Sequence, residues 1–121
     1  MLESHFEIFR GADALYYFHL RNHNAEVLLT GYPYFFKPGC YIGIVTIRSH
    51  CQLHYFKRTD APFAYSFRMV DKNNDIIAHS ISYLTSTERD HAIREVLTIA
   101  ALAPVVYLGS IMAMEADTVG S

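Results

Sequence analysis

The sequence predicts an α+β domain in which two tandem β-β-β-α-β repeats form one antiparallel sheet with two helices packed on one face. Three observations predict this fold class. The second half of the 121-residue chain repeats the first half at an offset of 49 residues. Apolar and polar residues alternate in several short segments, which is typical of half-buried strands. Each half also contains one segment with apolar residues at helical spacing.

The repeat consists of matched positions at one common offset. Tyr16 corresponds to Tyr65, and Phe18 corresponds to Phe67. Further identical pairs at this offset are Asn24 with Asn73, Tyr34 with Tyr83, and Ile44 with Ile93. An internal repeat determines how all the elements are arranged, so the predictions for single elements depend on it. We predict one domain, residues 1–108, made of repeats at about 5–53 and 54–108, followed by a C-terminal tail, 109–121.

Each half of the chain is predicted to contain a β-hairpin. In both halves an alternating segment is followed by a turn and then by a second β-rich run. A two-residue type I′ turn needs positive φ at both central positions, which Asn tolerates better than other residues with a Cβ. Asn73-Asn74 suits this turn well. Asn24-Ala25 suits it less, because Ala resists the left-handed region. We predict a hairpin of this type in both halves.

After each hairpin the periodicity changes to that of a helix. In the second half Thr85 and Glu88 form a capping-box pattern at the start of a helix over 86–100. Its apolar stripe consists of Ala92, Ile93, Val96, Leu97 and Ala100. In the first half Pro38 suits a first helical turn, whereas Gly43 and several β-branched residues disfavour a helix. The alignment of the repeats decides for a helix over 38–49, and further strands are predicted at 52–58 and 104–108.

The order of these motifs resembles a known family. The segments "YYFHL", "NAEVLLT" and "KPGCYIGI" follow one another, and a degenerate second copy comes after them. This arrangement is similar to the YegP-like family, small bacterial proteins built from a domain of unknown function, and the similarity covers roughly residues 5–108. The resemblance implies two repeats that share a single antiparallel sheet and exchange their last strands. It implies no catalytic residue and no cofactor.

Composition bounds the class of protein. Ten basic and twelve acidic residues give a net charge of −2, whereas nucleic-acid-binding domains usually carry a basic excess. The longest apolar run near the C-terminus, "IAALAPVVYL", is far shorter than the roughly 20 residues that span a bilayer. Two cysteines are too few for a disulfide scaffold, so we predict a reduced, cytoplasmic protein without a membrane segment. Two tandem repeats already provide within one chain the two units that a homodimer of single repeats would bring together, which favours a monomer.

The leading functional prediction is a non-enzymatic binding or protein-interaction module. The aromatic segment "GYPYFFKPG" (31–39) is the most unusual local feature, because exposed aromatic side chains beside a lysine can anchor a partner. The candidate interaction surface consists of Tyr32, Phe35, Phe36 and Lys37. The uncovered face of the sheet is a second candidate. No catalytic residue and no cofactor are predicted.

Two alternatives stay open. Cys51 with His50 and His54 offers thiolate and imidazole ligands for a metal, or the parts of a minor enzymatic site, although their spacing fits no standard zinc motif. An aromatic sheet face could instead bind single-stranded nucleic acid by stacking. The net charge of −2 argues against binding to nucleic acid.

Overall fold

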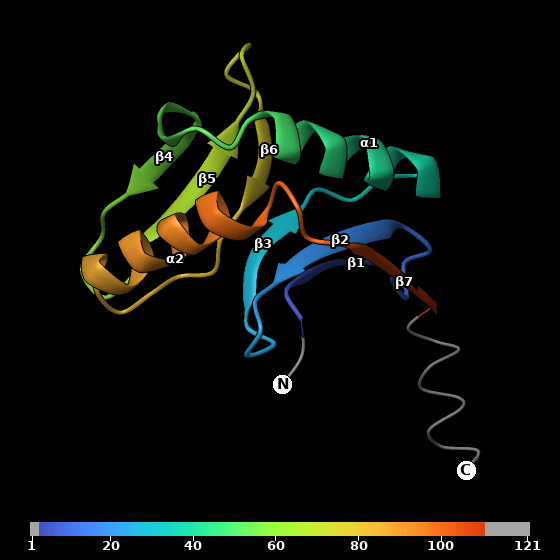
Figure 1. The fold of residues 1–121 in the computed structure, drawn as a ribbon, viewed down its shortest axis with the longest axis horizontal. Helices are drawn as coiled ribbons and strands as arrows, with labels where there is room; N and C mark the ends of the chain where they lie inside the picture. The colour runs from blue at the N-terminus through green and yellow to red at the C-terminus, as the bar shows by residue number, and fades with distance from the viewer. Residues whose placement is uncertain (1–2, 111–121) are drawn as a thin grey trace.

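The computed structural model describes residues 3–110, which form seven strands, one 3₁₀ turn and two α-helices (Figure 1). In chain order these are β1 (His5–Arg10), β2 (Tyr16–Arg21), β3 (Val27–Gly31), α1 (Lys37–Ser49), η1 (Leu53–Tyr55), β4 (Phe56–Thr59), β5 (Ser66–Val70), β6 (Ile76–His79), α2 (Ser86–Ile99) and β7 (Val105–Ser110). Both predicted helices are confirmed within one residue at each end. We call two residues equivalent when they lie 49 positions apart.

All seven strands belong to one sheet, in the order β4-β5-β6-β3-β2-β1-β7. Neighbouring strands are antiparallel except at one edge, where β7 runs parallel to β1 (Figure 1). The prediction of a wholly antiparallel sheet is therefore wrong, and the sheet is mixed. The reason is a long-range pairing: after α2 the chain returns beside its own first strand, and the Phe6 N–H donates to the Pro104 carbonyl at 2.8 Å. The predicted tail also starts too early, because residues 109 and 110 belong to β7, and residues 111–121 lie outside the described part.

One face of the sheet carries the hydrophobic core. Residues paired across neighbouring strands point to the same face, and Phe6, Leu20 and Leu29 form one such line. A second line consists of Gly31, Ala78, Met69 and Phe56. The helices bury their apolar stripes in the same cluster through Cys40, Ile44, Ile47, Ala92, Ile93 and Val96. Both helices therefore cover this face, as the sequence predicts. The opposite side, which neither helix covers, is called the open face.

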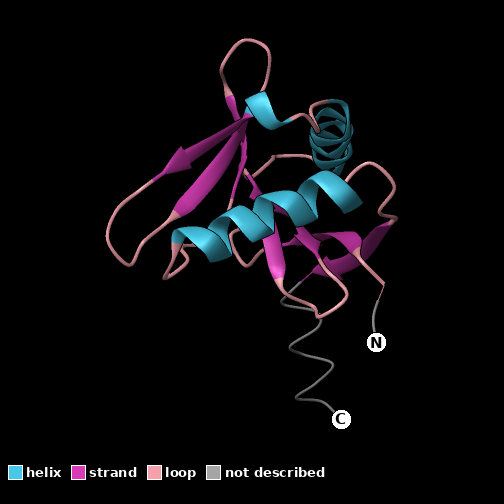
Figure 2. Ribbon diagram, turned by 60° about the vertical axis from the view of Figure 1, so that its left-hand side comes forward, coloured by secondary structure: helices cyan, strands magenta, loops and turns pink. Residues whose placement is uncertain are grey.

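The two helices differ in how they begin. The Thr85 hydroxyl accepts the Glu88 N–H at 3.1 Å, so the predicted cap of α2 is confirmed. At α1 the side chain of Phe36 makes no capping bond, and Pro38 occupies the first turn, where a missing N–H costs nothing. In Figure 2 α1 is seen end-on while α2 runs across the view, so their axes cross steeply. Among the described residues no helix combines the length and apolarity that crossing a bilayer requires.

The hairpin turns differ from the predicted type I′ turns. Only one residue of each turn has positive φ, Ala25 at 63° and Asn74 at 66°. In the first hairpin the Ala25 N–H donates to the Asn22 carbonyl, and the Asn22 N–H donates to the Glu26 carbonyl. This is a three-residue loop, in which a single left-handed residue follows a type I turn. The prediction of a two-residue turn is wrong because the side chain of Asn22, described below, fixes a longer loop.

Candidate functional site

The structure separates the four residues of the predicted interaction surface. Phe35 and Phe36 are together in the loop before α1, with 81% and 76% of their surface exposed. Tyr32 follows β3, and its ring lies 5.8 Å from that of His79 on the open face. Lys37 is half-buried, with its Nζ atom 3.5 Å from the centre of the Tyr107 ring of β7. Phe35 and Phe36 alone among the four thus form a common exposed surface.

Three further apolar residues are exposed on the outer side of α1. Tyr41, Ile42 and Val45 are exposed, Ile42 by 68% and Val45 by 60%. Residues three and four apart are neighbours on a helix surface, so the three side chains adjoin. We call Phe35, Phe36, Tyr41, Ile42 and Val45 together the α1 patch. The predicted interaction surface does not include these three helical residues, although apolar residues on both sides of one helix were the available signal.

The outer side of α2 has a different character. The residues equivalent to Tyr41, Ile42 and Val45 are Asp90, His91 and Arg94. Equivalent positions on the two helices are thus apolar in α1 and polar in α2, although both helices cover the same face of the sheet. Apolar side chains are therefore not required there by the fold.

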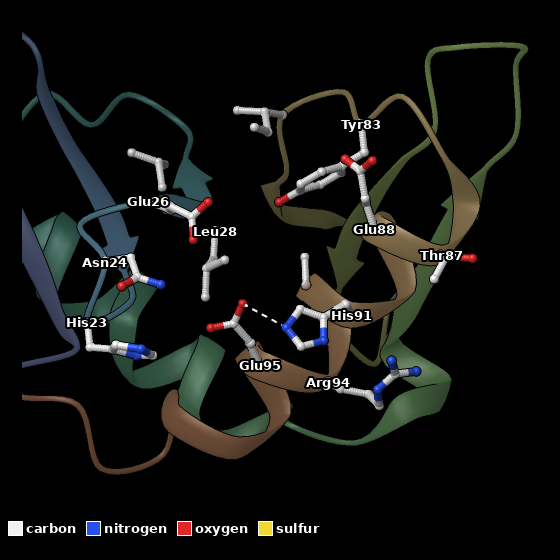
Figure 3. Close-up of a pocket in the computed structure, with 13 residues that line it drawn as sticks. His23, Asn24, Glu26, Leu28, Tyr83, Thr87, Glu88, His91, Arg94 and Glu95 are labelled. Atoms are coloured by element: carbon white, nitrogen blue, oxygen red, sulfur yellow. Dashed lines mark ion pairs between the residues drawn. The ribbon is translucent and has the colours of Figure 1, made fainter.

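A groove of about 800 Å³ lies between the β2–β3 hairpin, residues 81–83 and α2 (Figure 3). Its rim carries the carboxylates of Glu26, Glu88 and Glu95. Figure 3 shows the Tyr83 hydroxyl directed into the space that Glu26 and Glu95 also face. Burial, and then these three carboxylates, raise the pKa of Tyr83 to about 12. The phenol is therefore protonated at neutral pH.

Asn22 is buried beside this groove, with 1% of its surface exposed. Its Oδ1 atom accepts the N–H groups of Asn24 and Glu26, both at 3.0 Å. Its Nδ2 atom donates to Glu26 Oε1 at 2.9 Å and to Glu95 Oε2 at 3.1 Å. One amide therefore fixes the hairpin loop and ties it to α2. The fully hydrogen-bonded amide of Asn22 stabilises the fold. Without its N–H donors, the carboxylates of Glu26 and Glu95 would lie close together with no donor between them.

Asn22→Asp is expected to lower the free energy of unfolding at pH 7 by about 2 kcal/mol, because it replaces two N–H donors with a third carboxylate. The repulsion requires ionised carboxylates, so the loss should shrink as the pH falls toward 4. Urea unfolding at several pH values measures this. The control is Asp71→Asn at the equivalent, half-exposed position, where Asp71 Oδ1 accepts the N–H groups of Asn73 and Asp75. An equal loss at all pH values would contradict the electrostatic explanation.

The structure does not gather Cys51, His50 and His54, the alternative metal ligands, into a metal-binding group. The Cys51 thiol donates to the Ile47 carbonyl at 3.2 Å, and burial raises its pKa, which disfavours the thiolate. The rings of His50 and His54 both pack against Tyr55. Within residues 3–110, no three His, Cys, Asp or Glu side chains gather closely enough to hold a metal ion.

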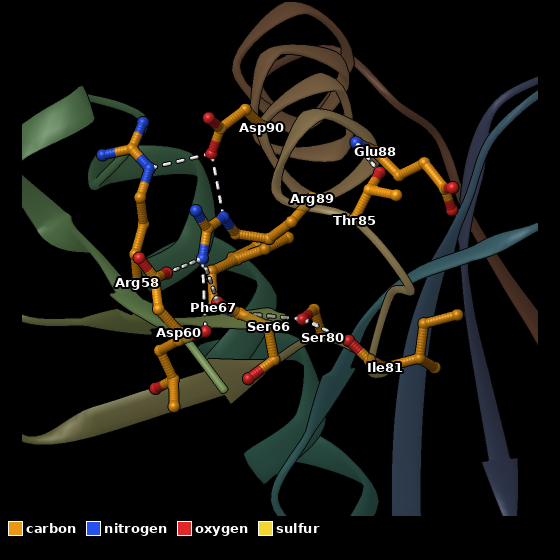
Figure 4. A network of polar contacts seen from close by, with 11 residues as sticks. Arg58, Asp60, Ser66, Phe67, Ser80, Ile81, Thr85, Glu88, Arg89 and Asp90 are labelled. Carbon is orange, nitrogen blue, oxygen red and sulfur yellow. Dashed lines mark hydrogen bonds and ion pairs between the residues drawn. The ribbon is translucent and has the colours of Figure 1, made fainter. Parts of the chain in front are cut away.

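A polar network joins α2 to the start of β5 (Figure 4). Arg89 is 3% exposed, and its guanidinium donates to the carboxylates of Asp60 and Asp90 and to the Thr59 carbonyl. Asp90 also accepts from Arg58 at 2.9 Å. Hydrogen bonds from Arg58 and, less strongly, Arg89 hold the pKa of Asp90 below its usual value. Every group in the network has an internal partner, so its role is to anchor the loop between β4 and β5.

Family relationships agree with this architecture. Residues 64–106 match the model of a family described as "Domain of unknown function (DUF1508)". The chain is 30% identical to the UPF0339 protein YegP of Escherichia coli O157:H7 over 93 residues, which are 75% of this chain and 84% of that protein. It is 25% identical to the "UPF0339 protein in ptx operon 5'region" of Stutzerimonas stutzeri over 107 residues, 87% of this chain and 96% of that protein.

Two solved structures share the fold. The solution NMR structure of YegP from E. coli, titled a protein of unknown function, superposes with a TM-score of 0.81 at 25% identity, covering 90% of this chain and 96% of that one. The solution NMR structure of a UPF0339 protein from Shewanella oneidensis gives 0.81 at 23% identity, covering 89% and 93%. The resemblance found in the sequence is confirmed. The chain belongs to the UPF0339 family, of which YegP is a member.

Proposed function

We propose that this protein is a non-enzymatic protein-interaction module whose contact surface is the α1 patch. The observation that carries the proposal is the contrast between the two helices. Tyr41, Ile42 and Val45 leave apolar surface in water where α2 has polar residues. Adjoining exposed apolar side chains, such as these three on α1, are typical of a binding site.

The composition of the patch fits a protein partner. Aromatic side chains such as Phe35, Phe36 and Tyr41 are the residue types that anchor protein interfaces, where they fill apolar pockets of the partner. The helix itself contains no acidic residue. A partner with an apolar contact surface would therefore complement the α1 patch.

Exchanging the three helical residues for their α2 equivalents tests the proposal. The triple variant Tyr41→Asp, Ile42→His, Val45→Arg should fold normally, because the substituted side chains are exposed and surface changes are usually nearly neutral. It should capture at least tenfold less of any partner that the unmodified protein enriches from a cell extract, as quantified by mass spectrometry.

Leu102→Arg provides the matched control, since Leu102 is a highly exposed apolar residue outside the α1 patch. This control should retain the partner in full. If the triple variant captured the same proteins in the same amounts as the control, the α1 patch would not be the contact surface.

We also propose that the chain is a tandem repeat of one unit, 5–53 and 54–108, which acts as a cytoplasmic monomer. Equivalent backbone features support the repeat. Ala14 and Phe63 both have positive φ, 68° and 61°. Isolated bridges join Tyr16 to Tyr34 and Tyr65 to Tyr83. Sedimentation of the purified protein tests the monomer, and fractionation of cells tests the location.

A further inference from the structure

A row of polar side chains crosses the open face of the sheet. Paired residues on neighbouring strands share a face, and the strand register places Lys57 opposite Arg68, and Arg68 opposite His79. The row continues through Thr30, His19 and Glu7 on β3, β2 and β1. These residues lie far apart in the sequence, and the sheet brings them into one line on the side that carries no helix.

The β4–β5 end of this row is basic and uncompensated. Lys57 and Arg68 are directly opposite each other, and like charges in that position are destabilising. Within residues 3–110 neither side chain forms an ion pair, and the described contact of Arg68 is a marginal one, 3.5 Å from Thr59 Oγ1. The acid of the row, Glu7, lies at the other end and is held by Arg21 and His5. A chain with net charge −2 thus has a local basic surface, which an anion would stabilise.

An aromatic ring lies beside the basic end. Tyr32 is 43% exposed, and its ring centre is 5.8 Å from that of His79. Tyr32 follows Thr30 by two residues, so alternation places both side chains on the open face. Cations that track phosphates, together with an aromatic ring on which a base stacks, are the two parts of a single-strand binding surface.

We propose that the open face of β4, β5, β6 and β3 binds single-stranded nucleic acid. Lys57 and Arg68 contact phosphates, and Tyr32 stacks on an unpaired base. Strands lie about 4.8 Å apart, so the row from Lys57 to Thr30 spans roughly 14 Å, enough for a few nucleotides. A duplex hides its base faces within the stack, and an acidic peptide would use the cations but not the ring. This surface lies opposite the helices, so it is independent of the α1 patch.

Fluorescence anisotropy with labelled dT12 and U12 oligonucleotides tests the proposal on the full chain. Binding is expected to be saturable and to weaken with salt. The slope of log K against log[salt] is about −0.7 for each neutralised phosphate on a single strand, so Lys57 and Arg68 together predict a slope near −1.4.

Two substitutions separate charge from stacking. Lys57→Glu should weaken binding about tenfold or more and flatten the salt dependence. The same change creates an opposite-charge pair with Arg68, so the melting temperature should stay the same or rise, which damage to the fold would not produce. Tyr32→Ala should weaken binding about tenfold without changing the salt slope.

Arg94→Glu is the matched control, because it makes the same change of net charge on the outer side of α2 and should alter affinity less than about threefold. The proposal is overturned if neither oligonucleotide binds at low salt, or if Arg94→Glu weakens binding as much as Lys57→Glu. It is also overturned if a poly-glutamate peptide displaces the label as well as unlabelled dT12 does, since the surface would then select negative charge alone.

Discussion

Gly31→Ala is expected to lower the free energy of unfolding by about 3 kcal/mol, at the upper end of the usual range for overpacking a core. A Cβ atom at this position would lie 2.0 Å from the Phe18 ring. Phe18 is fully buried, with Phe6 and Tyr34 close on other sides, so the ring has no free space to enter. Urea denaturation of the two proteins measures the difference.

A double-mutant cycle identifies the cause of that loss. Adding Phe18→Leu removes the ring, so Gly31→Ala should cost clearly less in that background than in the unmodified protein. Gly11→Ala is a second control, because the nearest atoms there belong to the exposed Asp13 and the half-buried Tyr17 and not to a fully buried ring. Additive effects of the two core substitutions would show that contact with Phe18 is not the reason.

Arg89→Ala should destabilise the protein by about 3 kcal/mol, because hydrogen bonds between charged groups are among the stronger ones in proteins. The guanidinium is buried and joins α2 to Asp60 and to the Thr59 carbonyl. Removing it leaves that carbonyl without its side-chain donor and opens space beside the Tyr65 ring, 5.7 Å away. Urea or thermal unfolding provides the measurement.

The geometry of the guanidinium can be separated from its charge. Arg89→Lys keeps the positive charge but not the planar fork of donors, so about half of the loss should remain. Arg94→Ala, an exposed arginine on the same helix, should change stability by less than about 0.5 kcal/mol. Equal losses for Arg89→Ala and Arg94→Ala would contradict the anchoring role.

Local patterns and the repeat predict most of the elements. The helix at α1 is the clearest case, since its β-branched residues and Gly43 favour other structures and only the alignment with residues 86–100 indicates a helix. The apolar stripes of the two helices also predict a sheet with both helices on one face. The orientation of β7 could not be predicted, because an apolar strand carries no local sign of being parallel or antiparallel to a partner almost a whole chain away.

The candidate surfaces were predicted in part. Phe35 and Phe36 are exposed, as an interaction surface requires, but Tyr32 and Lys37 point to other parts of the molecule. Alternation along each strand indicates which residues point away from the core. The basic pair of Lys57 and Arg68 depends in addition on the register between β4 and β5, which no local pattern reveals.

The pairing of β7 with β1 has a consequence for biosynthesis. The first strand leaves the ribosome early, yet its outer edge stays bare until the last strand has been translated. An unpaired edge is a template for another chain, so the nascent polypeptide carries this hazard until β7 is available to pair. The sheet of this protein is thus completed only after β7 has been synthesised.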